Sequence, residues 1–319
     1  RNINMRHVTG IKKYFFLLKA LNRELFTLPL GFILFLVKQM RFEKFTIHAG
    51  KVFINSIYTP FPSGSFRSAI KCFKRLSESK ISPFSVYISL TDECHLDCWH
   101  CSNFKDGKKH ELSYEDLKRI IHETQDAGAS CIGLTGGEPA LRVDLEKLIN
   151  QIDERSYSIL FTTGHSINLE RTRALQSAGL TIIVISLDSH IKEEHNSKRN
   201  SEIAFDEAIS AIKNSLEAGI YTALSTVITK KLLYSPKLYD FFEYVGALGV
   251  HEIRLLEPKP CGKLLNYEFD YLGEEDKKKI RELQYRINTK GKFPTIMALS
   301  HINSVDNYGC NAGRAHVYI

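Results

Sequence analysis

The sequence predicts an α/β fold in which six parallel strands alternate with helices. Three observations lead to this fold class. Short apolar runs typical of strands recur between residues 81 and 290, segments with 3.6-residue apolar periodicity separate them, and glycines at 128, 179, 219 and 249 follow helical segments. Strands that are each followed by a helix require a parallel sheet with right-handed crossovers. An open doubly wound sheet and a (β/α)6 barrel both satisfy this pattern.

The predicted elements follow one another in regular order. The strands are Ser85–Leu90, Cys131–Thr135, Ser158–Thr163, Thr181–Leu187, Tyr221–Ile228 and His251–Leu256. The helices lie near 113–127, 142–152, 168–178, 202–218, 235–247 and 274–289. Upstream, the alternation of apolar and polar residues over 44–58 predicts a β-hairpin, and a short helix follows it. We divide the chain into an N-terminal region (1–80), a main domain (81–290) and a C-terminal extension (291–319).

Composition and charge exclude several classes of protein. The 319 residues are 43% hydrophobic and 25% charged, which is typical of a folded globular protein and excludes a disordered chain. The formal charge of +7 lies entirely in residues 1–50, because residues 51–319 hold 34 basic and 34 acidic side chains. A nucleic-acid enzyme more often surrounds its catalytic groove with basic charge. We therefore expect no nucleic-acid partner.

The basic N-terminal segment is also strongly apolar. Leu25–Val37 is a run of 13 mostly apolar residues, which is short for a bilayer span of roughly 20 residues. Lys12, Lys19 and Arg23 share one face of a predicted amphipathic helix just before it. Two interpretations stay open: peripheral membrane contact through residues 1–44, or a helix packed on the body of the protein. We expect a cytoplasmic protein in either case.

Three of the seven cysteines lie close together after the first strand of the main domain. Cys94, Cys98 and Cys101 are spaced so that their thiolates can converge on one inorganic centre. Three thiolates on an iron–sulfur cluster leave one iron open to a ligand with amine and carboxylate groups. The alternative is a zinc site formed by the cysteines with His95 or His100. An odd number of cysteines in a chain of this length favours a reducing compartment over a disulfide framework.

The second strand ends in Gly136-Gly137-Glu138-Pro139. The two glycines allow close approach of the backbone to a ligand, and Glu138 offers a carboxylate to an ammonium group. With Cys-x₃-Cys-x₂-Cys after the first strand, this motif resembles the radical S-adenosylmethionine (radical SAM) superfamily over residues 84–290. The resemblance implies a partial (β/α)6 barrel of the TIM type, preceded by the N-terminal helices and hairpin.

The resemblance also assigns roles to individual residues. It implies that Cys94, Cys98 and Cys101 hold a [4Fe–4S] cluster whose fourth iron is chelated by S-adenosylmethionine. The cofactor-binding residues that it implies are Gly136, Gly137, Glu138, Pro139, Thr163, Ser186, Asp188, Arg199 and His100. Thr163 stands where the family often has asparagine. The resemblance assigns no catalytic side chain, because the cofactor carries out the difficult step.

The implied reaction is reductive cleavage of S-adenosylmethionine to a 5′-deoxyadenosyl radical, which abstracts hydrogen from a substrate. A low-potential electron donor, flavodoxin-like or ferredoxin-like, is the implied partner. We therefore predict an enzyme. A non-catalytic iron–sulfur or zinc-binding protein would need neither Gly-Gly-Glu-Pro nor Ser186-x-Asp188.

Cys310 lies in Gly309–Arg314, which resembles the opening of a SPASM or twitch extension. The resemblance implies that Cys310 is an auxiliary-cluster ligand in a longer protein, and we expect the extension to be truncated at Ile319. It also favours a peptide or protein side chain as substrate. The N-terminal segment favours the alternative, a lipid or membrane-associated small molecule.

Overall fold

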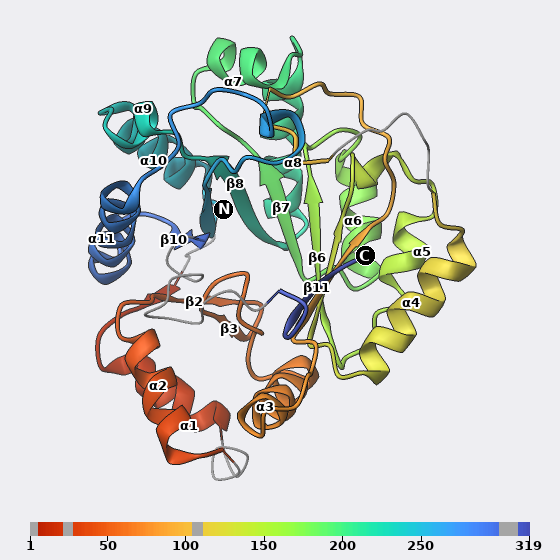
Figure 1. Ribbon diagram of the computed structural model, residues 1–319, viewed down its shortest axis with the longest axis vertical. Coiled ribbons are helices and arrows are strands. Elements are labelled where there is room, and N and C mark those ends of the chain that lie inside the picture. The colour runs from red at the N-terminus through yellow and green to blue at the C-terminus, as the bar shows by residue number, and fades with distance from the viewer. Residues whose placement is uncertain (1–5, 22–27, 104–110, 300–311) are drawn as a thin grey trace.

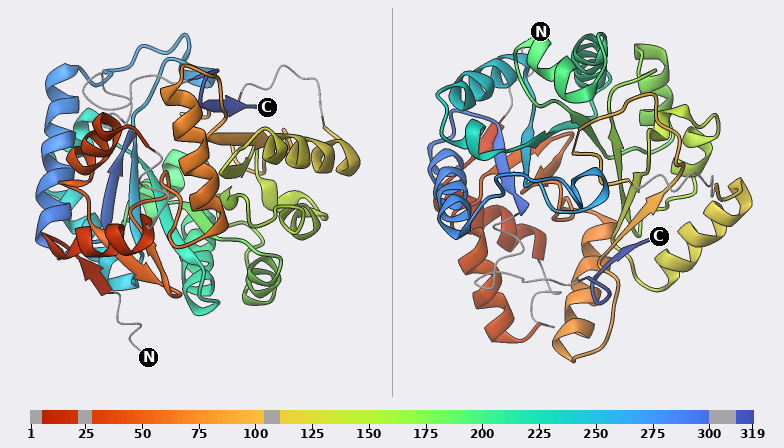
Figure 2. Two further views of the ribbon diagram at one scale, coloured as in Figure 1. Left: turned by 90° about the horizontal axis from the view of Figure 1, so that it is seen from below. Right: turned by 45° about the horizontal axis from the view of Figure 1, so that its top comes forward.

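A curled parallel sheet forms the centre of the computed structural model, which describes residues 6–21, 28–103, 111–299 and 312–319 (Figure 1). Its eight strands run in the order β10-β9-β8-β7-β6-β5-β4-β11. The six predicted strands are confirmed as β4 (Ser85–Ser89), β5 (Cys131–Thr135), β6 (Tyr157–Thr162), β7 (Ile182–Ser186), β8 (Tyr221–Val227) and β9 (Glu252–Leu256). The sheet stays open between its two edges, so the predicted partial barrel is confirmed; its curl is also visible in Figure 2.

Two edge strands were not predicted. β10 (Thr295–Ala298) pairs with β9, and β11 (His316–Tyr318) pairs with β4, both in the parallel sense. Each has four residues or fewer, which is too short for apolar alternation to stand out. The described parts of 291–319 therefore extend the barrel sheet. A separate extension stays a prediction, and Cys310 lies outside the described residues.

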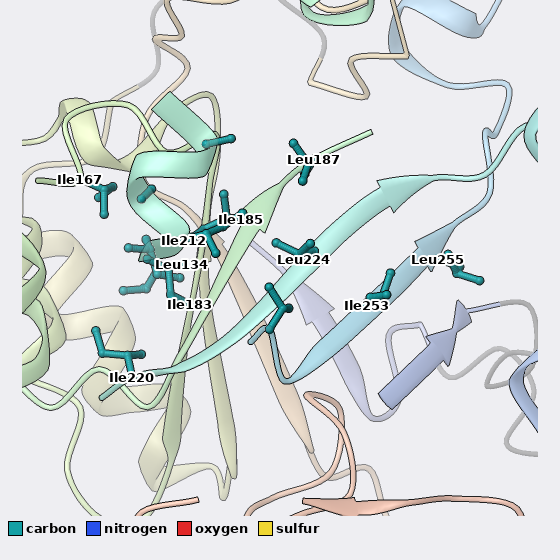
Figure 3. Close-up of a cluster of buried hydrophobic side chains, with 14 of the residues drawn as sticks. Leu134, Ile167, Ile183, Ile185, Leu187, Ile212, Ile220, Leu224, Ile253 and Leu255 are labelled. Carbon is teal, nitrogen blue, oxygen red and sulfur yellow. The ribbon is translucent and has the colours of Figure 1, made fainter. Parts of the chain in front are cut away.

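The helices connect and cover the strands. Those of the barrel are α4 (Tyr114–Asp126), α5 (Leu145–Ile149), α6 (Leu169–Ser177), α7 (Lys192–Arg199), α8 (Ala204–Glu217), α9 (Lys230–Leu233), α10 (Lys237–Leu248) and α11 (Glu274–Lys290). The short α7 and α9 were not predicted. Isoleucines and leucines on the outer sheet face, such as Ile183, Ile185 and Leu224, pack with Ile212 of α8 in the main core (Figure 3).

The predicted hairpin is confirmed and closes the barrel floor. β2 (Phe45–His48) and β3 (Lys51–Phe53) pair antiparallel, and β1 (Arg6–Val8) adds a third strand to them. Phe53 stacks on Tyr221 at the start of β8, with ring centroids 4.2 Å apart. The hairpin therefore fills the N-terminal end of the barrel, and the C-terminal ends of the strands remain for a site.

The N-terminal helices α1 (Lys12–Leu21), α2 (Leu30–Met40) and α3 (Gly64–Ser77) lie at the end of the molecule opposite α7 (Figure 1). Lys13 anchors α1, because its Nζ donates hydrogen bonds to the carbonyls of Met40, Arg41 and Glu43 at 2.7–2.9 Å. One side of α1 is thus packed on the body, as one of the two interpretations expected. No helix in the described part of the chain is both long enough and apolar enough to cross a bilayer.

Acid is expected to destabilise the barrel through His251, which is only 3% exposed. Its Nδ1 accepts a hydrogen bond from the Thr222 amide at 3.1 Å, and burial lowers the pKa of His251 to about 3. The unfolded chain therefore binds the extra proton first, and stability is lost as the pH falls below about 6.5. One such group gives a slope of up to about 1.4 kcal/mol per pH unit.

Urea unfolding of the metal-free protein between pH 7.5 and 4.5 measures this slope. We expect His251→Asn, which keeps an acceptor for Thr222, to unfold with a smaller pH dependence than the wild type. His122→Asn on α4 serves as the matched control. Equal slopes in the two variants would contradict the assignment to His251.

Candidate active site

The segments that carry the predicted site residues meet at the C-terminal edge of the sheet. The cysteine loop follows β4, Gly136–Pro139 follows β5, Thr163 follows β6, and Asp188 follows β7. The carboxyl ends of parallel strands lie at one edge of a sheet. The structure therefore brings together segments that are almost one hundred residues apart in sequence.

Gly136 and Gly137 pack against the start of the cysteine loop. The amide of Gly137 donates to the Thr91 carbonyl at 2.7 Å, and the amide of Glu138 donates to the Glu93 carbonyl at 2.7 Å. A Cβ atom at Gly136 would lie 2.4 Å from the Thr91 oxygen, and one at Gly137 would lie 2.0 Å from the Glu93 oxygen. The two glycines thus have a role within the chain, which is to seat the cysteine loop. Their approach to a ligand stays a prediction.

Glu138 is fully buried and joins the β5 and β6 loops. Its Oε1 accepts from the Thr162 hydroxyl at 2.7 Å and from the Ala140 amide at 3.0 Å. Its Oε2 accepts from the amide and the hydroxyl of Thr163 at 2.6 and 2.7 Å. Thr163 thus supplies two donors to Glu138. Since these four donors match the roughly four acceptor positions of a carboxylate, a contact of Glu138 with an ammonium group stays a prediction.

Asp188 and Arg199 form a buried ion pair that reaches Cys98. Arg199 Nη2 lies 2.7 Å from Asp188 Oδ2, and Arg199 Nη1 donates to Cys98 Sγ at 3.7 Å. Burial alone would raise the pKa of Asp188, but the neighbouring positive charge of Arg199 outweighs it and the pKa falls below its usual value. The pair is therefore ionised, and Arg199 presents positive charge to the sulfur that would ligate iron.

His100 and Cys101 follow Cys98 in the cysteine loop. His100 Nδ1 is buried and has no hydrogen-bond partner among the described residues, while burial lowers the pKa of His100 to about 4. A neutral His100 with an unpaired nitrogen fits a polar ligand contact. The loop after β9 contacts Cys101. The backbone carbonyl of Cys101 accepts a hydrogen bond from the Lys263 amide at 3.0 Å. Cys261 in that loop is exposed.

The three thiols of the cysteine loop are free of disulfides. Cys98 is buried, and Cys94 and Cys101 are partly exposed. Free thiols that share one short loop are available to ligate a common inorganic centre.

Sequence reasoning missed a group of residues on the inner face of the barrel. Arg254 of β9 is 4% exposed, and its guanidinium carbon lies 5.1 Å from the centre of the Phe161 ring. Tyr87 of β4 also lies on the inner face of the barrel, and burial raises its pKa to about 12. The available signal was an arginine within the otherwise apolar strand Ile253–Leu256.

Comparison with known proteins places the chain in a family. Residues 88–232 match the radical SAM superfamily. The chain is 31% identical over 246 residues to a probable GTP 3',8-cyclase of Saccharolobus islandicus, which covers 72% of this chain and 79% of that protein. It is 33% identical over 162 residues to Fe-coproporphyrin III synthase of Methanosarcina barkeri, covering 50% of this chain and 40% of that protein.

Solved structures agree with the fold. Two crystal structures of Streptococcus suis SuiB, one with its precursor peptide SuiA and one with S-adenosylmethionine, have TM-scores of 0.63 and 0.64 at 16% identity. They cover 83% and 80% of this chain, and the chain spans only 64% and 62% of the SuiB chains. The match of residues 88–232 to the family model and the 31% identity to the GTP 3',8-cyclase relative show that the chain belongs to the radical SAM superfamily, whose cofactors are a [4Fe–4S] cluster and S-adenosylmethionine.

Proposed function

We propose that this radical SAM enzyme abstracts a hydrogen atom from a small molecule that carries an anionic group and binds inside the barrel. Cys94, Cys98 and Cys101 would hold the cluster, with Arg199 beside Cys98. When bound, the cluster supplies the electron that splits S-adenosylmethionine into methionine and a 5′-deoxyadenosyl radical. We expect that electron to come from a flavodoxin-like or ferredoxin-like donor.

The buried arginine of the barrel supports the anionic substrate. Arg254 donates to the Ser56 hydroxyl, but its Nε is buried without a hydrogen-bond partner among the described residues. Glu252, on the same face of β9, accepts hydrogen bonds from Ser56 and Tyr221, and the positive charge of Arg254 also acts on it. Guanidinium groups bind carboxylates and phosphates in fixed geometry. Arg254 therefore offers a donor to an anion inside the barrel.

The curated relatives favour a small molecule over a peptide. Their names refer to GTP and to a coproporphyrin, whereas the likeness to the peptide-binding SuiB concerns the fold alone. The peptide expectation rests on Cys310, which lies outside the described residues. A small-molecule substrate is therefore the preferred proposal.

Replacing Arg254 with methionine tests the proposal. Reconstituted enzyme would be supplied anaerobically with dithionite, S-adenosylmethionine and, in turn, GTP, iron-coproporphyrin III and short peptides, and 5′-deoxyadenosine would be quantified. We expect an anionic small molecule to stimulate its formation above the substrate-free background, and Arg254→Met to reduce that stimulation about tenfold or more with iron content unchanged. Lys259→Met, an exposed lysine after the same strand, is the control. Stimulation by an uncharged peptide that Arg254→Met leaves intact would contradict the proposal.

We also propose that α1 and α2 bind the surface of an anionic membrane. Ile11, Phe15 and Leu18 near or on α1 and Leu30 and Leu34 on α2 are 60–76% exposed. Leu18 also lines an apolar cavity of about 190 Å³ that lies between α1, α2, α3 and the segment after β3. Exposed basic side chains at 12, 38 and 41 lie on the same segment. Apolar and basic groups together suit an anionic lipid surface.

Vesicle cosedimentation tests this contact. We expect the protein to bind vesicles that contain phosphatidylserine, and the double variant Phe15→Glu/Leu34→Glu to lose at least tenfold in affinity. Val143→Glu, an equally apolar residue that is 96% exposed elsewhere, is the matched control. Equal binding by the two variants, or binding that does not weaken with salt, would contradict the proposal.

A further inference from the structure

Two histidines and a glutamate converge beside the cysteine loop without any role in the proposed reaction. His165 Nδ1 lies 2.8 Å from Glu207 Oε1, and His95 Nε2 lies 3.5 Å from Glu207 Oε2. The two imidazole rings face each other with centroids 4.0 Å apart. All three ligand atoms lie within 4.8 Å of one another.

The three residues come from separate elements that the fold holds together. His95 belongs to the cysteine loop, His165 to the loop after β6, and Glu207 to α8. Gly164 allows the loop after β6 to pack closely on α8. Its φ is +101°, and a Cβ atom there would lie 3.0 Å from the Glu207 carbonyl oxygen. The packing of this loop on α8 therefore holds His165 close to Glu207.

The geometry matches the needs of one small metal ion. Imidazole nitrogens and a carboxylate oxygen bind zinc at about 2.0–2.2 Å, which places tetrahedral ligand atoms about 3.3–3.5 Å apart. The 3.5 Å separation of His95 Nε2 from Glu207 Oε2 matches this value, while the 2.8 Å contact of His165 Nδ1 with Glu207 Oε1 is a hydrogen bond that a bound ion would replace. Glu207 Oε2 is buried and has no hydrogen-bond partner among the described residues, so a lone pair remains there for an ion.

We propose that His95, His165 and Glu207 form a binding site for one divalent transition-metal ion, with zinc as the expected occupant, separate from the three thiols. Imidazole and carboxylate ligands suit zinc and its neighbours better than calcium or magnesium. Three protein ligands leave a fourth position for water or for an oxygen of a bound anion. The ion would also tie the cysteine loop to α8.

The test uses enzyme whose cluster has been reconstituted, so that the three site thiols are occupied. After removal of loose metal with a chelator, one equivalent of Zn²⁺ or Co²⁺ is added, and bound metal is measured by elemental analysis and by the visible absorption of Co²⁺. We expect one additional ion per chain beside the iron. His165→Ala and Glu207→Gln are expected to weaken its binding at least tenfold while leaving the iron content unchanged.

His122→Ala supplies a matched histidine away from the trio and is expected to bind the ion as the wild type does. The readout is metal content rather than activity, so it is independent of the substrate. Failure of the wild type to retain an ion would overturn the proposal, because the trio would then be held by hydrogen bonds alone. Equal retention by His165→Ala and the wild type would overturn it as well.

Discussion

Replacing Cys98 with alanine is expected to abolish 5′-deoxyadenosine formation and to remove most of the iron bound by the reconstituted protein. Cys98 is the central thiol of the three, and it is buried beside the Arg199 guanidinium. Three thiolates are the minimum that holds a cluster with one open iron, so the loss of one leaves too few ligands. About four irons per chain are expected in the wild type, measured by iron analysis and by chromatography of the products.

Cys261→Ala is the matched control for this experiment, since Cys261 is an exposed free thiol outside the loop. It is expected to keep both iron and product formation. Stoichiometric zinc in place of iron, with no deoxyadenosine from the wild type, would contradict the assignment of Cys94, Cys98 and Cys101 to a cluster. Retention of product formation by Cys98→Ala would contradict it equally.

The barrel could be predicted because each of its six central strands is a self-contained apolar run. Glycines at 128, 179, 219 and 249 indicated where four of the connecting helices end. β10 and β11 could not be predicted in the same way, because strands of three or four residues gain their stability from the neighbouring strand rather than from a pattern of their own. α7 escaped prediction for a related reason: it is strongly polar and is fixed by the buried side chains of His195 and Arg199.

The site was partly predictable for a different reason. Cys94, Cys98 and Cys101 are close in sequence, so their spacing alone indicates a shared centre. The contact of Arg199 with Cys98 joins residues that are 101 positions apart, and no local pattern reports such a contact. The same holds for Arg254 inside the barrel and for Glu207 beside His165. The motifs and the family resemblance thus named residues on several loops, but the contacts between those loops depend on tertiary packing.

Breaking the Asp188–Arg199 pair is expected to cost more stability than any other single polar substitution at the site. Asp188 is 1% exposed and Arg199 is 6% exposed. The Asp188 carboxylate also accepts from the Val227 amide at 2.9 Å, which ties the β7 loop to β8. Removing one partner of a buried ion pair leaves an uncompensated charge and typically costs about 3–5 kcal/mol. Arg199→Met should therefore lower the free energy of unfolding by about that amount.

The pH dependence separates this ion pair from a simple loss of packing. The pKa of Asp188 is lowered in the folded protein, so the stability that it contributes is present above its unfolded pKa of about 3.9 and is lost as the pH falls below that value. In Arg199→Met, burial without a positive partner should raise the pKa of Asp188, so the variant should instead lose stability as the pH rises above about 4.

Urea unfolding at pH 3, 4, 5.5 and 7 would measure both effects. Lys198→Met is the control for the loss of a nearby positive charge. The Lys198 ammonium donates to the backbone carbonyl of Asp188 at 3.1 Å, and its charge lowers the pKa of Asp188 less than that of Arg199 does. The double variant Asp188→Leu/Arg199→Met should lose less than the sum of the two single losses, since it leaves neither charge unpaired. Additive losses, or equal losses in Arg199→Met and Lys198→Met, would mean that the pair is not the element that holds α7 and the β7 loop at the cysteine site.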